Sequence, residues 1–343
     1  MQALSLAGCG GTTAPTQLPP PVTPATPQIT CPAAQSAQAI DASGAVVTFT
    51  TPTVVNGQLP ETTSCAPAAG TIFPVGQKTV TCTVTDSLQR TDSCSFVVTV
   101  GSPPKLASTT FLAFGDSITY GEDGQNSLAP SRALMSARVH PSVQFPEAQQ
   151  YPYLLQQDLA NRYRTQIPSV KNAGAPGEAA GDPATLVRFV NLVSTRQYSV
   201  ALIMEGSNDI FYGDASQEAV AIAGLRQMIR SAKGFGVRPY LATVPPTNPP
   251  ACDPVCRGRD EGGLVPGLND SIRALALSES VTLVDVYQAF GTNLALTGPD
   301  GLHPSAAGYA KIADVFFQSI EQTLETSLPS SSSPNLRHSS ARR

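Results

Sequence analysis

The pattern of hydrophobic and polar residues changes near residue 105. Before this point, apolar and polar positions alternate with a period of two over 46–50, Thr79–Thr85 and Ser95–Val100, and turn-forming residues separate these stretches. Such alternation predicts half-buried β-strands. Because the strands are short and no helical period lies between them, residues 29–101 are expected to form a small immunoglobulin-like β-sandwich.

After residue 105, short apolar runs alternate with helical patterns. Strands are predicted at Phe111–Phe114, Ser169–Asn172, Tyr198–Met204, Val237–Val244 and Val281–Val286. Helices are predicted over 151–164, 183–195, 215–234, 264–279 and 305–325. Strands that alternate with helices indicate an α/β fold, a parallel sheet with helices on both faces. In such folds the functional residues gather at the carboxyl ends of the strands.

Two flanking segments have no hydrophobic period. Residues 12–28 contain six prolines among threonines, which predicts an extended, semi-rigid tether. The Ser-rich residues 327–343 have almost nothing to bury, and we expect them to be disordered. The expected organisation is therefore a start and tether over 1–28, a β-domain over 29–101, an α/β domain over 106–326 and a tail over 327–343.

Composition narrows the classes of partner. The 343 residues carry a formal net charge of −4, and only 13% of them are charged. This balance argues against nucleic acid as the main partner, because phosphate binding needs clustered positive charge. No apolar run approaches the roughly 20 residues of a membrane-spanning helix.

Seven cysteines indicate the compartment. Cys31, Cys65, Cys82 and Cys94 fall in the β-region, whereas Cys252 and Cys256 lie four residues apart after the fourth strand of the α/β domain. Such clusters favour disulfides in an oxidising compartment. Zinc is the alternative, but no His lies beside these cysteines and no CxxC pair occurs. The spacing of the four cysteines in the β-region leaves three pairings open. A disulfide between Cys252 and Cys256 is expected to staple the loop after the fourth strand, at the carboxyl edge of the sheet, where it would shape access to any site formed there.

The seventh cysteine, Cys9, follows Leu6-Ala7-Gly8 and so resembles the lipidated cysteine of a bacterial lipobox. A basic segment and an apolar stretch of roughly 7–15 residues would precede such a site, and the sequence shows neither before Cys9. We therefore expect the true start to lie upstream. The alternative is a Gly-rich start with a free thiol. Attachment to a membrane through Cys9, in a secreted or cell-surface lipoprotein of a bacterium, is the expectation.

Residues with chemistry follow the predicted strands of the α/β domain. Ser117 comes directly after the first strand in Gly-Asp-Ser, and Asn208 comes after the third. A loop with Gly174 and Gly177, whose bare backbone could offer an N–H to a ligand, follows the second. His303 precedes the last helix, and the other two histidines, in a Pro-flanked loop and in the tail, are poorer candidates for a general base. Asp300, three residues earlier, could accept the second ring N–H.

These four blocks together resemble the SGNH hydrolases, also called GDSL esterases/lipases, over residues 110–325. The resemblance implies a flavodoxin-like three-layer α/β/α sandwich. It also implies a nucleophile at Ser117 with Asp300 and His303 as its partners, and an oxyanion hole formed by the backbone N–H groups of Ser117 and Gly177 with the side chain of Asn208. Gly177 fits the family spacing of five residues after Asn172, and Gly174 remains the alternative. The motif departs from the family where Ile118 replaces Leu.

Residues 29–101 resemble a hyalin-repeat (HYR) module through ITCP, the segment that contains Cys65 and Cys82, and the closing CSFVVTV. In that family such modules serve adhesion or spacing, so a surface partner for the module is expected.

The resemblances together imply a serine hydrolase of carboxylic esters that needs no cofactor. Its substrate would be a glycan acetyl ester, a lipid ester or a short-chain ester. Two alternatives remain open, an inactive surface adhesin and an O-acyltransferase that uses the same three residues.

Overall fold

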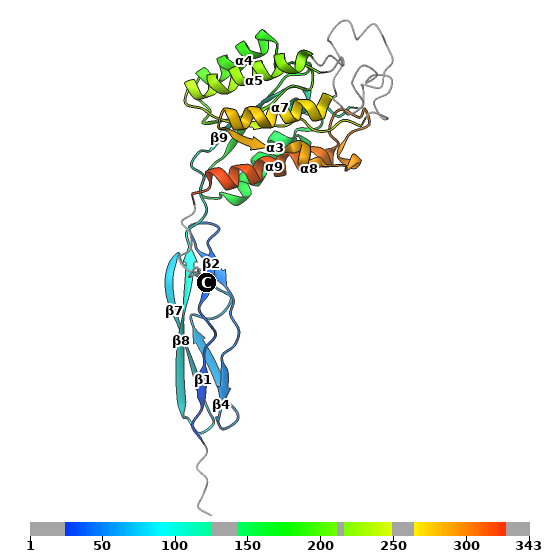
Figure 1. The fold of residues 1–343 in the computed structure, drawn as a ribbon. Helices are drawn as coiled ribbons and strands as arrows, with labels where there is room; N and C mark the ends of the chain where they lie inside the picture. The colour runs from blue at the N-terminus through cyan, green and yellow to red at the C-terminus, as the bar shows by residue number, and fades with distance from the viewer. Residues whose placement is uncertain (1–24, 125–142, 211–215, 249–263, 327–343) are drawn as a thin grey trace, which may run out of the picture. The chain divides into compact units, whose positions relative to one another are not determined.

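A computed structural model describes residues 25–124, 143–210, 216–248 and 264–326. The chain separates into two compact units, one comprising Met1–Ala37 and Val46–Thr99 and the other comprising Gln38–Ala45 and Val100–Arg343. The first is strand-rich and the second contains both helices and strands (Figure 1). Within the described residues, no helix is both long and apolar enough to cross a membrane.

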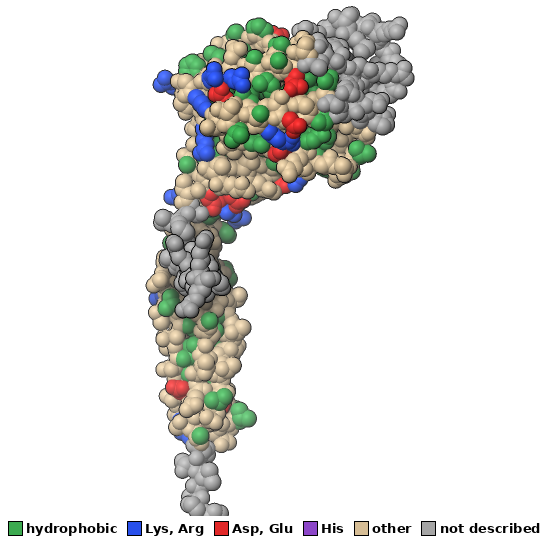
Figure 2. All heavy atoms as spheres, viewed as in Figure 1, with side chains coloured by type: hydrophobic (Ala, Val, Ile, Leu, Met, Phe, Trp, Pro, Cys, Tyr) green, Lys and Arg blue, Asp and Glu red, His purple; other side chains and the backbone are tan. Residues whose placement is uncertain are grey.

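The strand-rich unit consists of one four-stranded sheet and two two-stranded sheets. Its strands are β1 (Gln28–Thr30), β2 (Gln35–Gln38), β3 (Ala45–Val47), β4 (Thr53–Val55), β5 (Thr62–Ala66), β6 (Thr71–Phe73), β7 (Gly76–Thr85) and β8 (Thr91–Gly101). Four form a sheet in the order β2-β8-β7-β5, and β1 pairs with β4 and β3 with β6. On the face shown in Figure 2, charged side chains are sparse on this unit.

The period-two pattern of the sequence corresponds to inward-facing side chains. Along β7 the side chains of Val80, Cys82 and Val84 are fully buried, while their neighbours face outward. The strand predicted over 46–50 is correct in its alternation but too long, because β3 ends at Val47. Val47 is buried and Val46 is exposed, as the alternation predicts.

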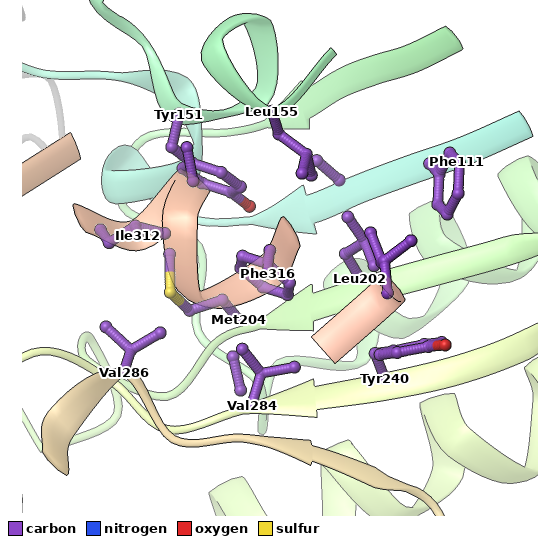
Figure 3. Close-up of a cluster of buried hydrophobic side chains, with 14 of the residues drawn as sticks. Phe111, Tyr151, Leu155, Leu202, Met204, Tyr240, Val284, Val286, Ile312 and Phe316 are labelled. Carbon is purple, nitrogen blue, oxygen red and sulfur yellow. The ribbon is translucent and has the colours of Figure 1, made fainter. Parts of the chain in front are cut away.

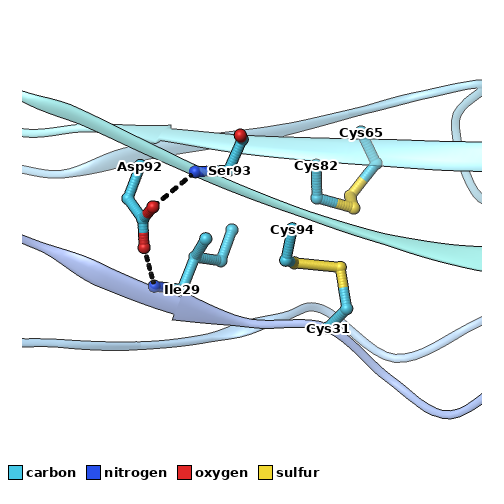
Figure 4. The surroundings of a disulfide bond; sticks show 7 residues. All are labelled: Ile29, Cys31, Cys65, Cys82, Asp92, Ser93 and Cys94. Carbon is cyan, nitrogen blue, oxygen red and sulfur yellow. Dashed lines mark hydrogen bonds between the residues drawn. A yellow bond between two sulfur atoms is a disulfide. The ribbon is translucent and has the colours of Figure 1, made fainter.

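Two disulfides staple the strand-rich unit, Cys31–Cys94 and Cys65–Cys82 (Figure 4). The second joins residues that lie directly opposite each other on β5 and β7. The first ties the residue after β1 to β8, close to where the Asp92 carboxylate accepts hydrogen bonds from the backbone of Ile29 and Ser93. The pairing that the sequence left open is therefore 31 with 94 and 65 with 82.

The two bonds should contribute unequally to stability. Cys31–Cys94 closes a separation of 63 residues and Cys65–Cys82 one of 17, and a longer loop loses more entropy in the unfolded chain. Replacing Cys31 and Cys94 by Ser should lower the free energy of unfolding by about 4 kcal/mol, against about 3 kcal/mol for the other pair. Differential scanning calorimetry of the two double variants would measure this, and an equal or reversed order would contradict it.

The second unit is organised around a five-stranded parallel sheet. Its strands are β9 (Thr110–Gly115), β10 (Ser169–Gly174), β11 (Val200–Met204), β12 (Arg238–Ala242) and β13 (Thr282–Val284), in the order β10-β9-β11-β12-β13. All neighbouring pairs are parallel. This is the flavodoxin-like order, in which the chain moves to opposite sides of its first strand. The switch in direction therefore lies at the carboxyl end of β9.

Helices cover both faces of the sheet. They are α1 (Ser117–Tyr120), α3 (Tyr151–Arg162), α4 (Pro183–Ser194), α5 (Ser216–Gly234), α7 (Leu264–Ser278), α8 (Val286–Phe290) and α9 (Ala306–Leu324), with short 3-10 helices η1 (Glu147–Gln149) and η2 (Leu294–Leu296). Helices α4 and α9 begin where Asp182 and Ser305 cap free backbone N–H groups. The five predicted helices and five predicted strands of this region are all present, with shifted ends.

Successive residues of each strand pack into opposite cores. Phe111 and Ala113 of β9 face a cluster formed with α3, α8 and α9, which includes Tyr151 and Phe316 (Figure 3). Leu112 and Phe114 face a second cluster formed with α4, α5 and α7. Because β9 is buried on both faces, its continuous apolar sequence is that of a central parallel strand.

A buried carboxyl group follows β11. The side chain of Glu205 is fully buried, and in the described part of the chain neither of its oxygens has a hydrogen-bond partner. Burial raises the pKa of Glu205 well above its ordinary range, and the nearby carboxylates of Asp116, Glu178 and Asp209 act in the same direction. The folded protein therefore holds a proton on Glu205 that the unfolded chain releases above about pH 4.3.

This proton makes stability depend on pH. Burial of Glu205 should destabilise the fold least below about pH 4.3, where the group is neutral in both states. Each pH unit above that should lower the free energy of unfolding by about 1.4 kcal/mol until the folded-state pKa is passed. Glu205→Gln carries no titrating proton, so its melting temperature should rise relative to the wild type between pH 5 and pH 8. The exposed Glu147→Gln variant is the control and should follow the wild type. If the melting temperatures of Glu205→Gln and the wild type change with pH in parallel, the assignment is contradicted.

Candidate active site

The carboxyl end of β9 places Ser117 at the switch in strand direction. Gly115 ends the strand where a Cβ atom would lie 2.4 Å from the Met204 carbonyl oxygen, so no other residue fits without displacement. Asp116 then caps α1 by accepting a hydrogen bond of 2.9 Å from the Ile118 N–H. Ser117 is thereby the first residue of α1, and its side chain is largely buried.

A tight turn before α9 presents His303. One oxygen of the Asp300 carboxylate accepts the backbone N–H groups of Leu302 and His303, at 3.0 Å and 2.9 Å. Gly301 adopts the left-handed conformation, with φ 70°, that this turn requires. The second Asp300 oxygen lies 2.5 Å from Nδ1 of His303. The turn therefore fixes both the position of the imidazole and the ring nitrogen that carries its hydrogen.

His303 joins Asp300 to Ser117. Its Nε2 lies 2.9 Å from the Ser117 Oγ, although the two residues are 186 positions apart in the chain. With Nδ1–H donated to Asp300, neutral His303 has a lone pair at Nε2 that accepts the Ser117 hydroxyl proton. The three residues that the sequence selected thus form one continuous chain of hydrogen bonds.

Asp300 and His303 each stabilise the charged form of the other, although burial disfavours both charges. Burial opposes ionisation of Asp300, but its hydrogen bond and charge attraction with His303, together with the backbone N–H groups of Leu302 and His303, outweigh this and lower the pKa of the carboxyl group. Burial also opposes protonation of His303, yet the hydrogen bond with Asp300 and nearby carboxylates raise the pKa of its imidazole above the ordinary value. His303 is therefore a stronger base than an isolated imidazole.

The loop after β10 is fixed to the end of β9. The Ala175 N–H donates to the Gly115 carbonyl at 2.9 Å. Gly174 packs so tightly that a Cβ atom would lie 2.0 Å from the Tyr120 backbone nitrogen, and its own N–H donates to the Asn172 side chain at 2.9 Å. The Gly174 N–H is thus engaged within the end of β10. Gly177 has φ 76° and has open space where a Cβ atom would stand.

Asn208 and Asp209 hold the far side of this loop. The Asn208 amide donates one hydrogen from Nδ2 to the Glu178 carbonyl at 2.7 Å, and an amide nitrogen carries a second. The Asp209 carboxylate accepts the N–H groups of Ala180 and Gly181, both at 2.8 Å. The amide of Asn208 therefore lies beside the peptide that joins Glu178 to Ala179, directly after Gly177.

Two acidic residues at this site were not identified from the sequence. Burial raises the pKa of Asp116, the capping residue beside Ser117, to about 7. Glu122 places its Oε2 3.1 Å from Nε2 of His303, and its side chain is also buried. Nothing in the local sequence marks Glu122, which directly follows the Gly121 C-cap of a four-residue helix.

An apolar hollow adjoins the site. Its lining includes Leu302, which precedes His303, and Ser207, which precedes Asn208, together with Ile210, Val244 and Val265. It offers an apolar surface close to the residues described above. Within the described residues, no group of three or more His, Cys, Asp or Glu side chains could hold a metal ion.

Three predicted residues lie outside the described ranges. These are Cys9, for which lipidation is expected, and Cys252 and Cys256, for which a disulfide is expected. Both expectations stay predictions.

Solved structures similar to this chain include several esterases. An aryl esterase of M. smegmatis matches with 19% identity and a TM-score of 0.49, over 62% of this chain and 99% of its own. A carbohydrate acetylesterase from Sinorhizobium meliloti matches with 18% identity and a TM-score of 0.47, over 62% of this chain and 98% of its own. An acetylxylan esterase from Geobacillus stearothermophilus matches with 22% identity and a TM-score of 0.45, over 63% of this chain and 96% of its own.

Family models cover both units. Comparison with curated proteins gave no match. Residues 23–100 match the HYR domain. Residues 113–311, more than half of the chain, match the GDSL-like lipase/acylhydrolase family. The match includes Ser117, Asn208 and His303, which the fold brings to one edge of the sheet. The chain therefore belongs to the GDSL-like lipase/acylhydrolase family and carries an HYR domain before its hydrolase domain.

Proposed function

We propose that this protein hydrolyses carboxylic esters through an acyl-enzyme on Ser117, with His303 as general base and Asp300 as its partner. The observation that carries the proposal is the chain of hydrogen bonds from Ser117 Oγ through both ring nitrogens of His303 to Asp300. A serine hydroxyl is a weak nucleophile unless a neighbouring base takes its proton. The hydrogen bond between Nδ1 and Asp300 supports the tautomer in which Nε2 of His303 can take that proton.

The reaction has two halves. Ser117 Oγ attacks the ester carbonyl carbon while its proton passes to Nε2 of His303. The imidazolium then gives this proton to the leaving alcohol oxygen, which departs and leaves an acyl group on Ser117. Water, deprotonated by His303, then attacks the acyl carbon. The bond from that carbon to Ser117 Oγ breaks, His303 returns the proton to Oγ, and the carboxylic acid leaves. Asp300 keeps its negative charge throughout and stabilises the imidazolium.

Negative charge develops on the carbonyl oxygen in each half. We assign the backbone N–H groups of Ser117 and Gly177 and the second Nδ2 hydrogen of Asn208 as its donors. Gly174 is the poorer candidate because its N–H already donates to Asn172. Donors fixed in place before the reaction stabilise the transition state without reorganisation.

We also propose that the protein acts outside the cytoplasm, with membrane attachment through a lipidated Cys9 and a surface partner for the HYR domain. The two disulfides of the strand-rich unit support an oxidising compartment. Mass spectrometry of the protein isolated from its native host would test both disulfide formation and modification of Cys9. Free thiols at Cys31 and Cys94 would contradict this location.

Ser117→Ala and His303→Ala should each lower kcat for p-nitrophenyl acetate by more than about 10³-fold. The double variant should have about the same kcat as either single variant, because the two residues act as one unit and their losses do not add. Ser194→Ala, an exposed serine near the end of α4, is the matched control and should keep wild-type activity. Circular dichroism checks that each variant is folded.

Near-normal turnover by folded Ser117→Ala would contradict the mechanism. An inactive wild type, tested across acyl chain lengths and acetylated glycans, would point to the adhesin alternative. Transfer of the acyl group to an added sugar acceptor in place of water would identify an acyltransferase.

Asn208→Ala should lower kcat by about 10²–10³-fold with little change in KM, because an oxyanion donor acts mainly on the transition state. Exposed Asn161→Ala in α3 is the matched control. Steady-state kinetics on p-nitrophenyl acetate separate the two constants. An increase in KM with unchanged kcat would show that Asn208 only binds ground-state substrate.

A further inference from the structure

Among the described residues, two side-chain oxygens lie within 3.1 Å of the Nε2 atom of His303. Ser117 Oγ lies 2.9 Å away, and Oε2 of Glu122 lies 3.1 Å away. The Glu122 side chain is buried, so its carboxylate acts on His303 with little screening by water. The nitrogen that must take the Ser117 proton therefore also touches a carboxylate.

Local structure holds Glu122 in this position. Helix α1 ends at Gly121, whose φ of 100° reverses the chain, and the Glu122 N–H donates to the Ser117 carbonyl at 3.1 Å. The buried Tyr309 hydroxyl of α9 donates to the Glu122 carbonyl at 2.8 Å. Residue 122 is thus tied to the same short helix that presents Ser117 and to the helix that follows His303.

The interaction between Glu122 and His303 changes sign during the reaction. Neutral His303 has a lone pair at Nε2, which cannot bond to a carboxylate because neither group supplies a hydrogen. Once the Ser117 proton has moved to Nε2, the new N–H can donate to Glu122 and the two charges attract. An interaction that is favourable only after proton transfer accelerates the reaction.

We propose that Glu122 is a positioning residue that stabilises the imidazolium form of His303 and so sets both the rate and the acid limit of hydrolysis. The proposal rests on the function proposed above and adds a fourth residue to it. The same attraction also favours protonation of His303 in the resting enzyme. Glu122 therefore raises the rate at high pH and shifts the loss of activity on the acid side to higher pH.

Other groups face His303 as well. Asp300 holds Nδ1 on the turn before α9, and Asp116 lies at the end of β9 with its carboxylate on the Ile118 N–H. Burial lowers the pKa of His303, whereas Asp300, Glu122 and Asp116 raise it, and the net shift is upward. Of these carboxylates, Glu122 has its contact at Nε2, the atom that exchanges the proton.

The test is the pH dependence of kcat/KM for p-nitrophenyl acetate in the wild type and in Glu122→Gln. Removing a negative charge at this distance should lower the acid midpoint by about one pH unit. The rate on the alkaline plateau should fall, by less than tenfold because the proton is only partly transferred in the transition state. The two profiles should therefore converge or cross on the acid side.

Two further variants separate charge from shape. Glu122→Asp keeps the charge but withdraws it by one methylene, so its midpoint should lie between those of the wild type and Glu122→Gln. Exposed Glu147→Gln should leave the profile unchanged. A purely structural role for Glu122 would lower the plateau of both Glu122 variants without moving the midpoint, and that outcome would overturn the proposal.

A measurement without turnover distinguishes this proposal from the proposed function. The ring resonances of His303 in ¹⁵N-histidine-labelled protein, assigned by their loss in His303→Ala, should titrate about one pH unit lower in Glu122→Gln than in the wild type. An unchanged titration in an active enzyme would refute the role of Glu122. If the titration of His303 shifts between the wild type and Glu122→Gln but the wild type cleaves no ester, the contact is upheld and the proposed function is refuted.

Discussion

The close approach of three chain segments at the end of β9 is the constraint on which the site depends. Gly115 lies opposite Gly174 of β10 and Met204 of β11 in the parallel register. Neither glycine has room for a Cβ atom, because the Met204 carbonyl occupies that space at Gly115 and the Tyr120 backbone occupies it at Gly174. A larger residue at either position would push α1 away from the loop after β10. The backbone donors that we propose at Ser117 and Gly177 would then no longer point toward one common oxygen atom.

Sequence reasoning predicted the parts of the molecule that depend on local pattern. The continuous apolar run of β9 and the amphipathic period of α9 identify a parallel sheet and its covering helix without knowledge of their neighbours. Ser117 was selected because it follows a strand end, His303 because the other two histidines lie in poorer positions, and Asp300 because it lies three residues before His303. The structure brings the three together in one chain of hydrogen bonds, and their catalytic roles stay a prediction. Strand ends were less accurate, as at β3, because tertiary pairing decides where a strand stops.

What the sequence could not supply depends on contacts between distant segments. The pairing of Cys31 with Cys94 follows from the proximity of β1 and β8, and spacing alone permits three pairings. Glu122 reads as an ordinary polar residue in a Gly-rich turn, and only its contact with His303 gives it significance. Glu205 lies in an apolar stretch where nothing local indicates that its carboxyl group is buried without a partner.

The Cys31–Cys94 bond also determines how tension would pass through the strand-rich unit. The two cysteines stand near the beginning and near the end of this unit, so a pull along the chain reaches Cys31 and crosses to Cys94 through the sulfur atoms. The strands between them, β2 to β7, bear none of that force and cannot be unravelled by it. The 63-residue separation between the cysteines, which would span roughly 200 Å when fully extended, therefore cannot contribute to lengthening of the chain under force. The unit would transmit force as a short, nearly inextensible link.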